Sequence, residues 1–191
     1  MAAWYTSNRH PMYYVGMDTE SLILDGGPIT PAELVEVARS SMQVQIGTHA
    51  INLMEASRKT VEQVIASDEP TYGINTGFGA LSTTNISHDR LCELQMNLLR
   101  SHAAGAGDPL DKDIVRGMMV LLAASLCRGH SGVRPLLAHC LAEMLNAGVT
   151  PVIPSLGSVG ASGDLAPLSH LALVLCGQGK ATIGNKTMTG K

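Results

Sequence analysis

The sequence predicts a mainly α-helical domain. Apolar residues make up 45% of the 191 residues, and in most segments they recur at helical spacing. Aromatic residues make up only 3%, so the core is expected to consist of Leu, Val, Ile, Met and Ala side chains. Residues 1–20 are expected to be a flexible extension, and residues 21–191 the domain. Two stretches, 71–86 and 149–163, are rich in Gly or in Gly, Pro and Ser, which predicts structured loops.

The clearest helix start follows a short apolar segment and a turn near the beginning of the domain. Thr30 can cap a helix, Pro31 suits its first position, and Glu33 completes a capping box. Apolar residues continue at helical spacing beyond this start. This helix is therefore expected to run to about Ile46.

The remaining elements follow from similar signals. Thr48, Ser87 and Asp111 precede further helical segments as candidate caps, and Gly148 closes one of them. The last helix is almost wholly apolar, which predicts burial on all sides. A small β-hairpin is expected at residues 181–188. These further helices are expected at about residues 48–66, 87–101, 111–127, 133–146 and 165–176.

Composition and charge exclude several classes of protein. The net charge is −3 and the pI about 6.1, which argues against a nucleic-acid partner. The longest apolar stretch, residues 117–127, is shorter than the ~20 residues that span a membrane. The first twenty residues lack the apolar segment of a signal peptide, so a cytoplasmic protein is expected.

Cysteine and histidine spacing gives no sign of a disulfide framework or a metal site. The four cysteines are far apart and form no C-x-x-C pair, so they are expected to be reduced, buried thiols. Five histidines have no metal-ligand spacing with these cysteines and are expected to be structural or exposed. These are His49, His88, His130, His139 and His170.

A run of small residues, 157–164, precedes the last helix and fits none of three common motifs. A phosphate-binding P-loop fails at Ser162, a nucleophile elbow fails at Asp164, and the dinucleotide pattern is absent. The run does permit backbone cyclisation, in which the amide nitrogen of Gly163 attacks the carbonyl carbon of Ala161. Glycine suits this step because it tolerates a bent backbone. Loss of two waters, one including the Ser162 hydroxyl, then leaves the electrophile 4-methylideneimidazole-5-one (MIO).

Three segments carry a resemblance to a known family: residues 72–79 (YGINTGFG), 97–105 (NLLRSHAAG) and 157–170 (GSVGASGDLAPLSH). They resemble, in order and separation, the tyrosine loop, the substrate-selectivity segment and the signature of the MIO-dependent aromatic amino-acid ammonia-lyases and aminomutases. The resemblance covers roughly residues 21–191 and is closest to the histidine ammonia-lyase type. It implies the N-terminal, MIO-bearing helical domain of such an enzyme.

This resemblance implies a reaction centre that needs no external cofactor. MIO formed from Ala161, Ser162 and Gly163 would capture the α-amino group of an amino acid and make it a good leaving group. Tyr72 is implied as the base that removes the β-proton. A tyrosine hydroxyl is a weak base at neutral pH unless its surroundings stabilise the phenolate, which the amides of a glycine-rich loop can do. The alternative for Tyr72 is a packed core aromatic.

The resemblance also implies the residues that read the substrate. Ser101 and His102 stand where the family contacts the substrate side chain, and Gly79 of the tyrosine loop is implied as a further contact. A Ser-His pair resembles the histidine ammonia-lyase type, because an imidazole can hydrogen-bond to a polar ring. The alternative for His102 is a helix cap. Asp164 is expected either to orient the cyclising loop or to cap the next helix.

The implied reaction converts L-histidine to trans-urocanate and ammonia. Family members are well over twice this long, and their remaining chain forms a helical bundle that assembles a homotetramer and supplies further active-site residues. The chain is therefore expected to be a fragment with negligible lyase activity of its own. A tyrosine ammonia-lyase or an aromatic aminomutase of the same family is an alternative, as is a non-catalytic helical interaction module. A serine hydrolase is disfavoured by the failed nucleophile elbow.

Overall fold

The helices carry most of the fold. The structure, a computed structural model, describes residues 21–67, 69–160 and 163–190, so the extension expected at residues 1–20 lies outside the described residues. The part of the chain that is described confirms the mainly α-helical class. Its α-helices are α1 (Pro31–Arg39), α2 (Thr48–Ser67), α3 (Leu91–His102), α4 (Lys112–Cys127), α5 (Pro135–Asn146) and α6 (Leu165–Leu175).

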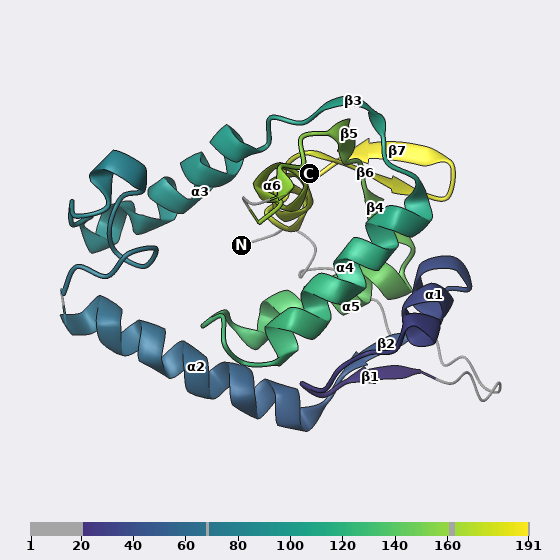
Figure 1. The fold of residues 1–191 in the computed structure, drawn as a ribbon, viewed down its shortest axis with the longest axis horizontal. Coiled ribbons are helices and arrows are strands. Elements are labelled where there is room, and N and C mark those ends of the chain that lie inside the picture. The colour runs from purple at the N-terminus through teal and green to yellow at the C-terminus, as the bar shows by residue number, and fades with distance from the viewer. Residues whose placement is uncertain (1–20, 68, 161–162, 191) are drawn as a thin grey trace, which may run out of the picture.

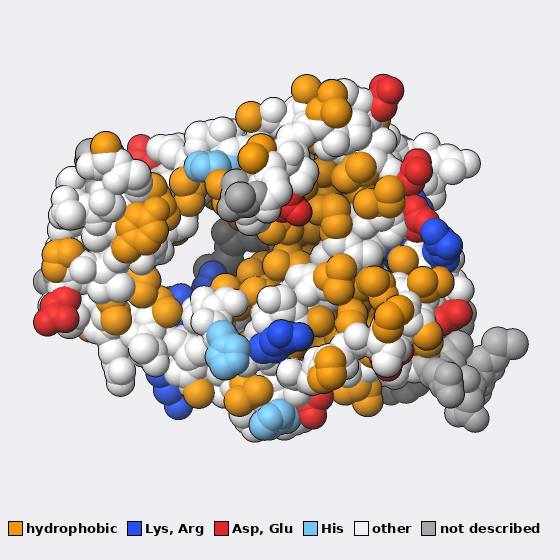
Figure 2. Space-filling view, viewed as in Figure 1, with side chains coloured by type: hydrophobic (Ala, Val, Ile, Leu, Met, Phe, Trp, Pro, Cys, Tyr) orange, Lys and Arg blue, Asp and Glu red, His pale blue; other side chains and the backbone are white. Residues whose placement is uncertain are grey.

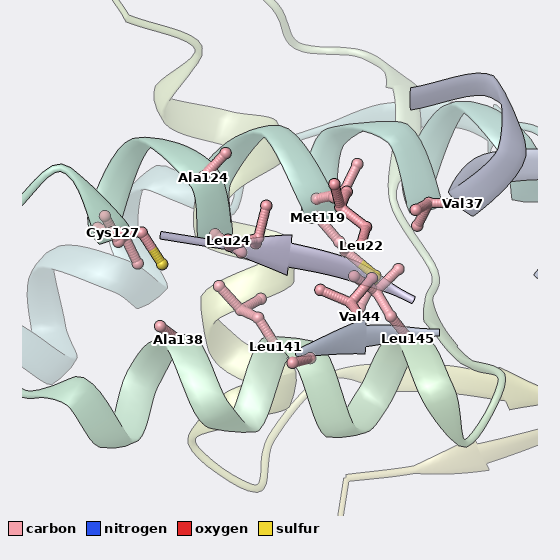
Figure 3. Packing of buried hydrophobic residues seen from close by; sticks show 14 of the residues in the cluster. Leu22, Leu24, Val37, Val44, Met119, Ala124, Cys127, Ala138, Leu141 and Leu145 are labelled. Carbon is pink, nitrogen blue, oxygen red and sulfur yellow. The ribbon is translucent and has the colours of Figure 1, made fainter. Parts of the chain in front are cut away.

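The core lies around α4, which packs against both α1 and α5 (Figure 3). Met119 and Ala123 of α4 and Leu141 of α5 are fully buried. The core is aliphatic, as the scarcity of aromatic residues predicts. Burial of such apolar surface contributes roughly 25 cal/mol per Å² and is the main term that holds these helices together.

A parallel strand pair, β1 (Leu22–Leu24) and β2 (Val44–Ile46), flanks this core, and Leu22 pairs with Val44. The expectation that the first helix runs to Ile46 is therefore wrong. The capping box of Thr30 and Glu33 is confirmed, but α1 ends at Arg39 because the chain turns back to build β2 beside β1.

The helix expected after Gly47 is confirmed as α2, although its N-terminus is capped differently. Thr48 is the first helical residue, and the carboxylate of Asp25 accepts a hydrogen bond of 3.1 Å from the amide of Ala50. A side chain at Gly47 would overlap this carboxylate. The cap thus comes from a residue distant in sequence, which local pattern does not reveal.

The two stretches expected as loops differ in outcome. Residues 71–86 are irregular, with a 3-10 turn at Gly79–Leu81 and a bridge between Thr76 and Asn85. A second 3-10 turn, His88–Arg90, precedes α3, so this helix begins at Leu91 and not at Ser87. The stretch 149–163 contains two strands, and the expectation of a loop throughout is wrong there.

These two strands belong to separate antiparallel sheets. β4 (Val149–Pro151) pairs with β6 (Lys180–Ile183), which pairs with β7 (Lys186–Thr189) and confirms the predicted hairpin. β5 (Pro154–Leu156) pairs with β3 (Ala106–Pro109). The second pairing joins the chain that follows α3 to the chain that precedes α6.

Two expectations about burial are only partly met. α6 is buried at Pro167, Ser169, Leu171 and Val174, but Leu165 in its first turn is 47% exposed, so burial on all sides is wrong. Elements pack on part of its surface, namely α3 and β4. All four cysteines are free thiols, but they are not all buried. Cys127 is buried, Cys140 is half-buried, and Cys92 and Cys176 are exposed.

The elements are arranged as a core with two projecting arms (Figure 1). α2 and α3 form the arms, and residues 69–90 join their far ends. Figure 2 shows that an opening remains between these arms and the core in the space-filling view. None of the helices in the described ranges combines the length and the apolar character that a membrane span requires.

Candidate active site

The pairing of β3 with β5 brings two of the predicted segments together. Ala106 lies opposite Leu156, so Gly105 and Gly157 are neighbours just beyond the pair. A Cβ atom on Gly157 would lie only 3.1 Å from the Cα atom of Gly105, and the φ of Gly157 is +152°. Glycine is therefore required at this contact. The end of the substrate-selectivity segment thus touches the start of the loop that carries residues 161–163.

Ser101 and His102 lie in the last turn of α3, just before this contact. His102 Nδ1 is 2.8 Å from the carbonyl oxygen of Leu98, and the Ser101 hydroxyl donates to the same oxygen at 2.9 Å. A carbonyl oxygen only accepts, so Nδ1 carries a proton and Nε2 of the neutral ring is an acceptor. The His102 ring therefore bonds back to the carbonyl of the preceding helical turn and still offers one nitrogen to a ligand.

The loop at residues 157–164 is closed on itself by its polar side chains. The Ser158 hydroxyl donates to the Asp164 carboxylate across the loop. Asp164 has a φ of +53° and makes no side-chain cap to α6 within the described residues. Of the two roles expected for Asp164, the geometry favours that of orienting the loop.

The predicted ring-forming tripeptide falls within this stretch of the sequence. Ala161 and Ser162 fall outside the described residues, whereas Gly163 is described with a φ of +78° and open space where a Cβ would stand. Two successive left-handed residues, Gly163 and Asp164, bend the chain, and the bond from Ser158 holds its two ends near each other. A bend directly after the tripeptide, and open space where a side chain at Gly163 would stand, are compatible with an MIO group formed from residues 161–163.

The tyrosine loop stands apart from this loop. Tyr72 is 63% exposed, and its ring packs edge-on against Phe78 with 5.7 Å between the ring centroids. Gly79 begins a 3-10 turn with a φ of +57°. Figure 1 places this loop at the N-terminal end of α3, and the 12 residues of α3 span about 18 Å. Tyr72 and Gly79 are thus together with each other but not with His102 and Gly163.

Asn75 holds the tyrosine loop, and sequence reasoning did not single it out. Its side chain is buried, accepts 2.7 Å from the Thr71 amide and donates 2.9 Å to the Glu69 carbonyl. These bonds close the chain around Tyr72. Asn in a glycine-rich loop is a recognised sign of such a side-chain turn, so a signal was present.

His170 was expected to be structural or exposed, and the structure gives it a specific backbone contact that sequence reasoning did not single out. It lies on α6, is half-buried, and its Nε2 accepts a hydrogen bond of 3.1 Å from the amide of Gly105. Burial lowers the pKa of the His170 imidazole, which favours the neutral ring that can accept this bond. The available signal was a lone imidazole in a helix whose other residues, apart from Ser169, are apolar.

The solved structures that match this fold include ammonia-lyases and aminomutases. A tyrosine aminomutase from Streptomyces globisporus matches with a TM-score of 0.83 and 34% identity, over 90% of this chain and 32% of that chain. The histidine ammonia-lyase from Trypanosoma cruzi matches with a TM-score of 0.81 and 38% identity, over 90% of this chain and 33% of that chain. The fold is therefore that of the ammonia-lyases and aminomutases.

Sequence comparison gives the family. A family model described as aromatic amino acid lyase matches residues 29–191, and the chain belongs to that family. A curated relative, the histidine ammonia-lyase of Paracidovorax citrulli, is 50% identical over 171 residues, which are 90% of this chain and 33% of the relative. The chain spans about a third of the length of the curated relatives it matches.

Proposed function

We propose that this chain is the MIO-bearing N-terminal part of a histidine ammonia-lyase, which converts L-histidine to trans-urocanate and ammonia. The contact between the segment that ends at Gly105 and the loop that starts at Gly157 carries this proposal. It brings the segment that carries His102 against the start of the loop in which the predicted tripeptide falls, and this supports the proposal. The 50% identity to a histidine ammonia-lyase supports the same substrate.

Each residue of the proposed site has one task. When formed from residues 161–163, MIO supplies an electrophile that makes the substrate amino group a better leaving group. His102 presents Nε2 as an acceptor for an N–H of the substrate imidazole. Tyr72 takes the proton from the β-carbon, the electron pair of that C–H bond becomes the new Cα–Cβ double bond, and ammonia departs with the electrons of the C–N bond.

The position of Tyr72 supports the proposal that the 191-residue chain alone has negligible lyase activity. A general base has to lie within hydrogen-bond reach of the proton it removes. Tyr72 is 63% exposed and belongs to the segment that precedes the N-terminus of α3, whereas the contact of Gly105 with Gly157 lies beyond the C-terminus of α3. Measurable conversion of histidine to urocanate by a verified 191-residue species would overturn this part of the proposal.

The first test is the intact mass of the purified chain with peptide mapping over residues 149–176. A mass lower than the sequence by two waters, localised to residues 161–163, is expected. The Ser162→Ala variant is the matched control, because it lacks the hydroxyl that leaves. An unmodified mass, both here and in a longer protein that contains these residues at the length of its relatives, would contradict the proposal.

The substrate is tested in that longer protein. Histidine, tyrosine and phenylalanine are supplied separately, and urocanate from histidine is the expected main product. A tyrosine aminomutase is a second candidate, favoured by the match to the enzyme of Streptomyces globisporus. It would give a β-amino acid from tyrosine in place of an unsaturated acid. We also propose a homotetramer for the longer protein, which light scattering measures directly.

A further inference from the structure

We propose that His170 is a positioning residue that holds the His102 segment against the electrophile-forming loop, so that both face one amino acid. The inference rests on the proposed function for its catalytic consequence and on the geometry for the contact itself. It assigns a role to a residue whose hydrogen bond goes to the backbone of Gly105 and not to the substrate-reading side chain.

The contact made by His170 is directional. Its Nε2 accepts from the Gly105 amide at 3.1 Å, so its other ring nitrogen, Nδ1, carries the proton. Gly105 follows His102 by three residues and immediately precedes β3. The bond therefore fixes the backbone where the chain leaves α3, which sets where the His102 ring stands.

The same face of α6 also contacts the other segment. Ala166 and His170 are four residues apart and lie on one face of the helix. A Cβ atom on Gly157 would lie 3.2 Å from the Ala166 Cβ, and a Cβ atom on Gly105 would lie 3.0 Å from His170 Nε2. The Ala166 side chain of α6 thus packs against Gly157, and the His170 side chain, one turn later, bonds to Gly105.

These contacts allow little relative movement between the segment that ends at Gly105 and the loop that starts at Gly157. Gly105 is also close to Pro154 of β5, whose Cβ would be 3.1 Å from a Cβ on Gly105. At the far end of the loop, Ser158 and Asp164 are bonded directly before α6 begins. The helix that carries His170 therefore receives the loop at its start and holds the His102 segment one turn later.

The experiment compares three variants. His170→Leu removes the acceptor at similar volume, and His170→Gln keeps a side-chain acceptor. His139→Leu is the matched control, because His139 is also a half-buried histidine on a helix, α5. Amide hydrogen exchange at Gly105 is measured in the 191-residue chain. KM and kcat for histidine, and the fraction that has lost two waters, are measured in the longer protein.

In His170→Leu we expect the Gly105 amide to exchange about tenfold faster, KM to rise about tenfold and the dehydrated fraction to fall, since one hydrogen bond is lost. His170→Gln should restore most of each value, and His139→Leu should change none of them. The proposal would be overturned if exchange at the Gly105 amide is unchanged in His170→Leu. It would also be overturned if KM and the dehydrated fraction are unchanged in a functional enzyme. A lower melting temperature alone would not rescue it. An equal effect of His139→Leu would overturn it as well.

A further measurement is made on the wild-type protein, so it does not depend on whether a variant folds. The ¹⁵N shifts of the His170 ring at neutral pH report which nitrogen is protonated, and protonated Nδ1 with unprotonated Nε2 is expected. A proton on Nε2 would overturn the proposal, because that nitrogen could not accept from Gly105. If the wild-type protein neither loses water nor turns over histidine, the proposed function fails, while the tautomer and the exchange data still decide whether His170 holds Gly105.

Discussion

The guanidinium of Arg116 lies inside the core and donates a hydrogen bond of 2.7 Å to the carbonyl oxygen of Val37. A second bond of 2.9 Å goes to the carbonyl oxygen of Leu145. Val37 lies near the end of α1 and Leu145 near the end of α5, so one side chain on α4 satisfies the carbonyl ends of both helices.

Replacing Arg116 by Met should lower the free energy of unfolding by about 2–4 kcal/mol, since the buried carbonyls lose their donors. Urea denaturation followed by circular dichroism measures the change. Arg39→Met is the control, because Arg39 forms an exposed ion pair with Asp113 and should change stability by less than ~1 kcal/mol. Equal effects of the two substitutions would contradict this assignment.

The Asp25 carboxylate caps α2 through its bond to the Ala50 amide. Asp25→Ala should cost about 1 kcal/mol of unfolding free energy, as the loss of other side-chain caps does. Asp25→Asn keeps an oxygen acceptor and should cost less. Hydrogen exchange in the first turn of α2 would localise the effect, and a uniform change over all helices would argue against it.

The Cys127 thiol should make stability depend on pH in alkaline solution. Burial, with a smaller contribution from the charge of Asp25, raises the pKa of this thiol from its usual 9.0 to about 11. Between these values the unfolded chain releases the proton and the folded chain keeps it, so stability falls as pH rises from 9 to 11. The loss is on the order of 2–3 kcal/mol.

Urea midpoints at intervals between pH 8 and pH 11 measure this slope. The comparison is with Cys127→Ala, which removes this thiol and leaves every other titratable group in place. That variant is less stable at pH 8 but should have the shallower slope. Parallel curves for the two proteins would show that Cys127 does not contribute.

The bond between Ser158 and Asp164 should matter for ring closure more than for folding. Asp164→Ala and Ser158→Ala should both reduce the fraction of chain that has lost two waters, while α6 stays folded because Asp164 does not cap it by its side chain. Ser158→Thr keeps the hydroxyl and is the control. Mass spectrometry measures ring closure, and circular dichroism measures helix content. Full ring closure in Asp164→Ala would show that the bond between Ser158 and Asp164 is not needed for it.

The sequence pattern predicted the features whose signals lie within a few neighbouring residues. The Thr30–Glu33 capping box, the long apolar run of α4 and the hairpin of β6 and β7 are each written within a few neighbouring residues, and all three are confirmed. The three-residue strand β2 was expected as helix, because so short a strand shows no alternation and the helical spacing of α1 continues toward it.

The site was harder to predict than the helices. The three segments could be picked out by resemblance, but the contact of Gly105 with Gly157 depends on the pairing of β3 with β5, which joins residues far apart in sequence. The hydrogen bond that the Gly105 amide donates to His170 depends on that same contact. Residue type alone did not distinguish this histidine from the others on the chain.

The close approach of Gly105 and Gly157 has a consequence for directed evolution of this fold. A library confined to residues 101–105 would change which side chains fit and also disturb the neighbouring loop. Many clones would then be scored as having lost the desired specificity, although the fault in them would be that the ring proposed at residues 161–163 has not closed. Libraries that vary residues 101–105 together with 157–160, screened first by mass and then by turnover, would recover them.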